Sequence, residues 1–330
     1  MAHHHHHHMT ATAQIPGGAM VQQTAGFVLS QLARHRSSWN KETMCPPLVV
    51  GVQGPQGAGK SHLTGLLPDY LEKHYGLRLA TMSLDDFYLT HSDQVKLSQS
   101  EPDNPLLNGR GPAGTHDLPL LEQCLAKLKS INDRSAKFPT ATKDQRAQLP
   151  IYDKSLFKGE GDRSKEVVEV QGPIDVVIFE GWMNGFGPLS NDKLEEKYAE
   201  AGRQWPSSSL VGAPGVMPTI LLYSRSTLHS INQNLRQYEV LWDQIDCFVQ
   251  IQPLDLSYVW TWRLQQEHNM KAKNGGNGMT DEQVRHFINR YMPSYELFQD
   301  GIDKETTSWR GKGLRFIVNI KREIVGTESF

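Results

Sequence analysis

The chain has 330 residues and a formal net charge of −2, with 38% hydrophobic and 21% charged residues, and its first eight residues, Met1–His8, form an expression tag. The near balance of charge excludes a dedicated nucleic-acid-binding protein, and no apolar run is long enough to cross a membrane. Three widely spaced cysteines disfavour a disulfide framework or a zinc site and favour a cytoplasmic location, with the nucleus as the alternative.

Two segments have the composition of irregular structure. Residues 9–20 are small and polar and are predicted to be disordered, and apolar residues at helical spacing then predict an N-terminal helix within 21–44. The polar stretch 132–165, with eight Lys or Arg against five Asp or Glu, is predicted to be an insertion with loops.

The rest of the chain alternates predicted strands with predicted helices. Strands are predicted at Leu48–Val52, Leu77–Leu84, Val176–Phe179, Thr219–Tyr223, Cys247–Ile251 and Leu314–Ile320. Helices are predicted at Ser61–His74, Leu118–Ile131, Ser226–Tyr238, Leu256–Lys273 and Asp281–Phe298. This alternation indicates an α/β fold with a doubly wound, mainly parallel sheet and helices on both faces.

A glycine-rich motif between the first strand and the next helix matches G-x-x-x-x-G-K-[ST] in full. Its glycines let backbone N–H groups turn towards a phosphate, and the helix N-terminus adds its positive dipole end. Lys60 is expected to reach the β- and γ-phosphates, and the Ser61 hydroxyl to ligate Mg²⁺. No guanine-reading N-K-x-D element is present, which favours ATP as the nucleotide. The residues predicted to bind it are Gly54, Pro55, Gln56, Gly57, Ala58, Gly59, Lys60, Ser61 and His62.

Carboxylates follow two of the predicted strands. Asp85 and Asp86 end the second strand, at the edge of the sheet where open α/β folds bind ligands. Successive side chains point in opposite directions, so only one of the two faces an acceptor hydroxyl readily, where it could orient that group or accept its proton. Glu180 follows four apolar residues and is a candidate to hold Mg²⁺. The alternative for all three is a role as a helix cap or turn residue.

Together these motifs resemble the uridine kinase, phosphoribulokinase and pantothenate kinase group of P-loop kinases, and more closely plant D-glycerate 3-kinase with its fungal and bacterial relatives. The segments that carry the closer resemblance are Arg110–Asp117, Phe179–Phe186, Trp262–His268 and Tyr291–Tyr295. The resemblance implies a P-loop NTPase fold with one kinase domain over 45–330. Within it, 132–165 would form a substrate region and 256–280 a helical lid.

The resemblance also implies roles for individual residues. Asp85 aligns with the catalytic aspartate of the wider group and is also a candidate Mg²⁺ ligand. Tyr88, Asp117 and Tyr152 align with residues of the acceptor pocket. Arg263 aligns with lid arginines that close over the phosphates.

Three further basic residues are candidates on chemical grounds. Arg110 lies in a glycine-rich loop, where its planar guanidinium could clamp a substrate carboxylate, with a solvated loop arginine as the alternative. Lys271 and Lys273 are alternatives to Arg263 as the cation of the lid.

These observations predict an ATP-dependent kinase that transfers the γ-phosphoryl group to a hydroxyl of a small acceptor, with a glycerate-like acid as the leading candidate. A nucleoside or pantothenate-type acceptor is one alternative. A regulatory ATP-binding module that hydrolyses slowly and has no small acceptor is another. The expected partners are a small-molecule substrate with no nucleic acid and no membrane, and the expected state is a monomer or weak homodimer.

Overall fold

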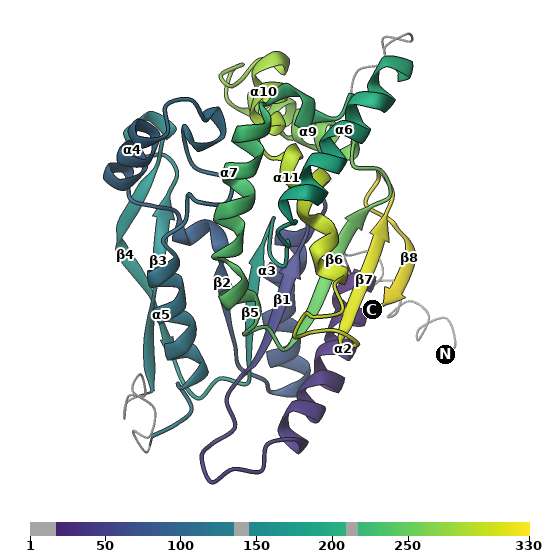
Figure 1. Ribbon diagram of the computed structural model, residues 1–330. Helices are drawn as coiled ribbons and strands as arrows, with labels where there is room; N and C mark the ends of the chain where they lie inside the picture. Colours follow the sequence, from purple (N-terminus) through teal and green to yellow (C-terminus); the bar gives the residue numbers. More distant parts are fainter. Residues whose placement is uncertain (1–17, 135–144, 209–216) are drawn as a thin grey trace.

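The computed structural model describes residues 18–134, 145–208 and 217–330, so the predicted tag and the predicted disorder over 9–17 lie outside the described residues. At its centre is a six-stranded sheet of order β2-β5-β1-β6-β7-β8 (Figure 1). All pairs in it are parallel except β7 with β8, which confirms the mainly parallel α/β fold. The strands of the sheet are β1 (Leu48–Gln53), β2 (Leu79–Ser83), β5 (Val176–Gly181), β6 (Cys247–Pro253), β7 (Gly313–Val318) and β8 (Ile324–Ser329).

Helices cover both faces of this sheet because its inner strands are apolar on both sides. Val176 and Ile178 of β5 pack in a core with α2 and α3, and the alternate residues Val177 and Phe179 pack in a second core on the opposite face. No helix in the described ranges has both the length and the apolar character to cross a membrane. The helices are α2 (Gly18–Ser37), α3 (Lys60–Tyr75), α4 (His91–Ser100), α5 (Leu118–Lys129), α6 (Asn191–Ser208), α7 (Arg225–Arg236), α8 (Glu239–Trp242), α9 (Tyr258–Lys273), α10 (Asp281–Asn289) and α11 (Met292–Phe298).

The N-terminal helix differs from the prediction at both ends. It begins at Gly18, inside the segment predicted to be disordered, and ends at Ser37. Met20 and Val21 are buried in the core that α2 and α3 form with one face of the sheet. This burial of apolar surface explains why the helix starts early.

The segment predicted as a strand at Thr219–Tyr223 is instead a 3₁₀ helix over Thr219–Leu222, so that prediction was wrong. The Glu296 carboxylate accepts hydrogen bonds from the backbone N–H groups of Thr219 (3.0 Å) and Ile220 (3.1 Å). A side chain therefore accepts the hydrogen bonds of these two N–H groups, which in a strand would be donated to carbonyl oxygens of a neighbouring strand.

The polar region 132–165 contains more regular structure than predicted. Its described part enters an antiparallel hairpin of β3 (Arg146–Asp153) and β4 (Asp162–Gln171), which stands apart from the main sheet (Figure 1). The predicted helix Asp281–Phe298 is also two helices, α10 and α11, with Pro293 in the first turn of the second.

A line of buried polar side chains crosses the main sheet. Arg315 of β7 donates from Nε to Gln250 Oε1 (2.5 Å), and Gln250 Nε2 donates to Gln53 Oε1 (3.0 Å). Gln53 Nε2 then donates to the Trp182 carbonyl oxygen (2.8 Å). At its outer end Arg315 pairs with Asp303 and with Glu328 of β8. The line connects the edge of the sheet to the loop after β5.

The central strand leaves no room for a side chain at Gly51. A Cβ there would lie 2.8 Å from a Phe248 ring carbon and 2.9 Å from Ile245 Cγ2. We expect Gly51→Ala to lower the free energy of unfolding by about 1–3 kcal/mol through overpacking, measured by urea denaturation. Gly65→Ala in α3 is the matched control: its Cβ meets nothing within 4 Å, so it should stabilise by about 0.4–1 kcal/mol. Equal effects of the two variants would contradict the packing described here.

Candidate active site

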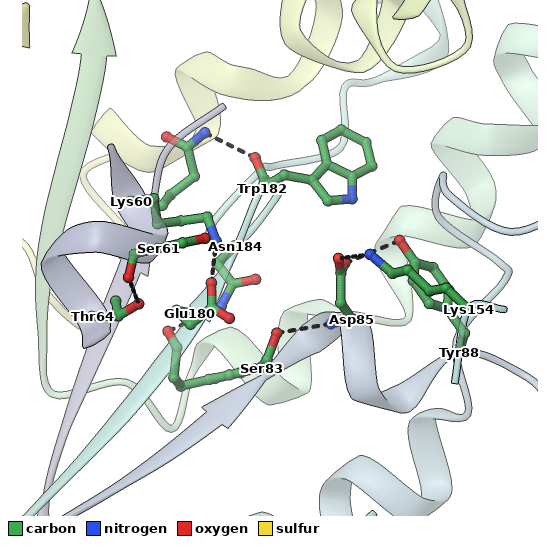
Figure 2. Close-up of polar contacts among 12 residues, drawn as sticks. Lys60, Ser61, Thr64, Ser83, Asp85, Tyr88, Lys154, Glu180, Trp182 and Asn184 are labelled. Atoms are coloured by element: carbon green, nitrogen blue, oxygen red, sulfur yellow. Dashed lines mark hydrogen bonds and ion pairs between the residues drawn. The ribbon is translucent and has the colours of Figure 1, made fainter. Parts of the chain in front are cut away.

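Sheet order brings three chemically important segments to one edge. Glu180 of β5 pairs in register with Val52 of β1 on one side and Ser83 of β2 on the other. The phosphate-binding loop follows β1, and Asp85 follows β2, so the loop, Glu180 and Asp85 lie in sequence across the carboxyl ends of adjacent strands (Figure 2). The strand order also reverses at β1, which is where open α/β sheets bind ligands.

The phosphate-binding loop packs directly against α9, the helix that the resemblance implies is part of a lid. Gly57 has a φ of +85° and Gly59 a φ of +100°, a left-handed conformation that only glycine adopts without strain. A Cβ at Gly57 would lie 2.5 Å from Trp262 Cβ of α9. The Gly57 carbonyl oxygen accepts a hydrogen bond from Arg322 Nε (2.5 Å), and the Arg322 guanidinium lies over the Trp262 ring. The phosphate-binding loop, α9 and the β7–β8 turn are therefore in direct contact.

Lys60 and Glu180 form an ion pair at the start of α3, and both side chains are largely buried. A phosphate in the loop would be a second anionic partner for Lys60, in addition to Glu180. The Glu180 carboxylate and the Ser61 hydroxyl offer hard oxygen ligands for a metal ion beside that phosphate. This donor set fits Mg²⁺.

Asp85, and not Asp86, faces the cleft. Its carboxylate accepts hydrogen bonds from Lys154 Nζ (2.8 Å) and the Tyr88 hydroxyl (3.1 Å) (Figure 2). Burial would raise the pKa of Asp85, but Lys154 and then Lys60 outweigh it and leave that pKa lowered. Asp86 instead accepts from the backbone N–H of Tyr152 (3.0 Å), which joins β3 to the end of β2. Asp85 therefore lines the cleft, whereas the carboxylate of Asp86 is engaged with the hairpin.

A stack of aromatic rings holds the Tyr88 hydroxyl at Asp85. The Tyr88 ring stacks on His116 with centroids 4.6 Å apart and meets Tyr152 edge-on at 5.5 Å. His116 is buried and hydrogen-bonds the Tyr238 hydroxyl (2.5 Å), and burial lowers the pKa of His116 to about 3, so the ring is neutral. Its neutral, packed state fits a structural residue and not a base.

A cleft of about 1530 Å³ runs from the phosphate-binding loop past Asp85 towards the hairpin. Arg110 and Lys154 line it, and Arg110 Nη1 donates to the carbonyl oxygens of Gly159 (2.8 Å) and Glu160 (2.6 Å). Arg110 therefore holds the hairpin tip in place. The role of Arg110 as a clamp for a substrate carboxylate stays a prediction.

Three predicted acceptor-pocket residues do not line this cleft directly. Asp117 caps α5 through the Leu120 N–H (3.1 Å) and pairs with Arg163 (2.8 Å). Tyr88 and Tyr152 are buried behind Asp85. Their roles as substrate contacts stay predictions, and the structure gives each a local packing or capping role.

Arg263, one of the three residues predicted as the cation of the lid, lines the cleft. Its guanidinium pairs with the buried Glu267 (3.3 Å) and lies over the Phe287 ring at 5.4 Å. Lys271 Nζ donates to the Met279 carbonyl oxygen (3.0 Å), and Lys273 lies in an outer groove beside α9.

Sequence reasoning missed Lys154 and Arg322 as residues of the cleft. Lys154 lies two positions after Tyr152, which the resemblance assigns to the acceptor pocket, so its place in the sequence was a usable signal. Arg322 carried no such signal, because the predicted last strand stopped before it and the return strand β8 was not foreseen.

No protein-family model matches the chain, whereas several kinases are similar to it in sequence or in structure. A solved structure of D-glycerate 3-kinase from Cryptococcus neoformans var. grubii is 93% identical, covers 95% of this chain and 100% of that chain, and has a TM-score of 0.87. The uncharacterized kinase mug58 of Schizosaccharomyces pombe is 37% identical over 255 residues, 76% of this chain and 81% of that protein. The chain belongs to the D-glycerate 3-kinase-like family of ATP-dependent P-loop kinases.

The chloroplastic D-glycerate 3-kinase of Arabidopsis thaliana is 38% identical over 271 residues, 81% of this chain and 51% of that protein. The kinase described here thus spans about half the length of the plant enzyme.

Contact between the loop and α9 makes a specific prediction for this kinase. In Gly57→Ala the new methyl group strains a left-handed backbone and collides with Trp262, so ADP affinity should fall by at least about tenfold in titration calorimetry. Gly76→Ala is the control, because Gly76 has a φ of +66° but no atom within 4 Å of an added Cβ, and it lies at the far end of α3. It should lose stability and keep its ADP affinity. If Gly57→Ala also binds ADP normally, the loop does not depend on this contact.

Proposed function

We propose that this kinase transfers the γ-phosphoryl group of ATP to a hydroxyl of D-glycerate, with Mg²⁺ as the metal. The observation that carries the proposal is that the ionised Asp85 lines the same cleft as the phosphate-binding loop. A basic residue, Lys154, contacts the Asp85 carboxylate in that cleft. Relatives named D-glycerate 3-kinase support the choice of acceptor.

The loop and Lys60 would hold the β- and γ-phosphates of ATP. Ser61 and Glu180 would hold Mg²⁺, which would supply charge neutralisation at the phosphates. Glu180 would also keep Lys60 pointed at the phosphates, because its carboxylate already pairs with that ammonium group. Asp85 remains an alternative metal ligand.

Asp85 would orient the acceptor hydroxyl and accept its proton as the phosphoryl group transfers. The Tyr88 hydroxyl, held by the aromatic stack, fixes one oxygen of the carboxylate and so directs the other towards the cleft. Arg263 would approach the transferring group from the lid, where movement of α9 would exclude water.

A panel of acceptors tests the substrate. We expect ADP release, followed by a coupled assay, to rise with D-glycerate and to stay at the basal rate with uridine or pantothenate. Release with uridine or pantothenate alone would overturn the proposed acceptor. Tight ATP binding with no response to any of them would favour the regulatory ATP-binding module.

The neighbouring aspartates offer a matched pair of variants. Asp85→Asn should lower turnover by about 10²–10⁴-fold, because the amide can neither accept the proton nor carry the charge, while ADP affinity is kept. Asp86→Asn retains an oxygen for the Tyr152 N–H and should change turnover by less than about tenfold, with a small loss of stability. A loss below tenfold for Asp85→Asn, or equal losses in both variants, would remove Asp85 from the chemistry.

A further inference from the structure

Lys154 is a cation of the cleft whose function towards the acceptor has not yet been described. Lys60 pairs with Glu180, Arg263 pairs with Glu267, and Arg110 holds the hairpin tip. Within the part of the chain that the structure describes, the ammonium group of Lys154 hydrogen-bonds only Asp85. Its side chain is 53% exposed and that of Asp85 is 38% exposed, so solvent and ligands reach this ion pair.

We propose that Lys154 recognises the carboxylate of the acceptor, and that it moves from Asp85 to that carboxylate when the acid binds. This inference rests on the proposed function, because it assumes an acceptor acid. It makes Lys154 the residue that selects a short hydroxy acid over other alcohols.

The size of the acceptor requires a cation at this position. In a three-carbon hydroxy acid, covalent geometry keeps the carboxylate oxygens within about 5 Å of the terminal hydroxyl oxygen. A hydroxyl that hydrogen-bonds Asp85 therefore brings a second negative charge into the same small space, and two carboxylates repel unless a cation lies between them. Lys154 Nζ, 2.8 Å from Asp85 Oδ2, is in that space. Uridine carries no carboxylate, and that of pantothenate is separated from its hydroxyl end by a longer chain.

The side chain can move while its backbone stays fixed. The backbone N–H of Tyr152 is hydrogen-bonded to Asp86, and Arg110 holds Gly159 and Glu160 on the other side of the turn. Between these two anchors the Lys154 side chain is a flexible stem with a compact charge. An ion pair that is this exposed to solvent contributes little to stability, so leaving Asp85 costs little.

Lys154→Met tests the inference, since it keeps the length of the stem and removes the charge. With ATP saturating, we expect KM for D-glycerate to rise about 10- to 100-fold, as for loss of a charged hydrogen bond, with kcat changed less than KM. KM for ATP and the melting temperature should stay near those of the unaltered enzyme, and Lys154→Arg should restore part of the affinity. Lys158→Met, in the same exposed turn, is the control and should leave KM for D-glycerate unchanged.

A competitive inhibitor separates recognition of the acid from an effect on Asp85. D-lactate keeps the carboxylate and lacks the terminal hydroxyl, so its inhibition constant should rise in Lys154→Met together with KM for D-glycerate. An unchanged KM with a reduced kcat would show that Lys154 acts through Asp85 instead and would overturn the inference. If the unaltered enzyme does not phosphorylate D-glycerate at all, the proposed function has failed before the variant is measured.

Discussion

The spacing between neighbouring parallel strands governs the geometry of this active site. Adjacent strands lie about 4.8 Å apart, and β5 stands between β1 and β2, so the phosphate-binding loop and the segment with Asp85 are separated by roughly two such spacings. Glu180 occupies the strand between them and pairs with Lys60 on the loop side. A phosphoryl group and an acceptor hydroxyl can then fit between the phosphate-binding loop and Asp85.

The parts of the fold that sequence predicted correctly are those with strong local patterns. The continuous apolar run of β5 and the glycine motif before α3 each determine their own structure, because burial on two faces and left-handed backbone are properties of a few residues. The strand predicted at Thr219–Tyr223 failed because Glu296, more than seventy positions later, binds its backbone donors. Nothing within the segment itself carries that information.

The candidate site shows the same division. Its loop, Asp85 and Glu180 could be found from sequence, since each follows a recognisable strand. The choice between Asp85 and Asp86 could not, because it depends on the hairpin whose Tyr152 N–H takes up Asp86. The resemblance assigns Asp117 to the acceptor pocket, whereas in the structure its carboxylate caps α5 and pairs with Arg163. Side-chain partners from distant segments decided these cases.

The line of buried amides across the sheet has a direction. A guanidinium only donates hydrogen bonds, so Arg315 fixes which end of the Gln250 amide is the oxygen, and Gln250 in turn fixes Gln53. The Trp182 carbonyl thus receives its hydrogen bond from an amide whose orientation is set three strands away, at the rim of the molecule. Without the positive charge at that rim, both glutamines would be free to turn over, and the tryptophan beside Asp85 would lose a fixed backbone anchor.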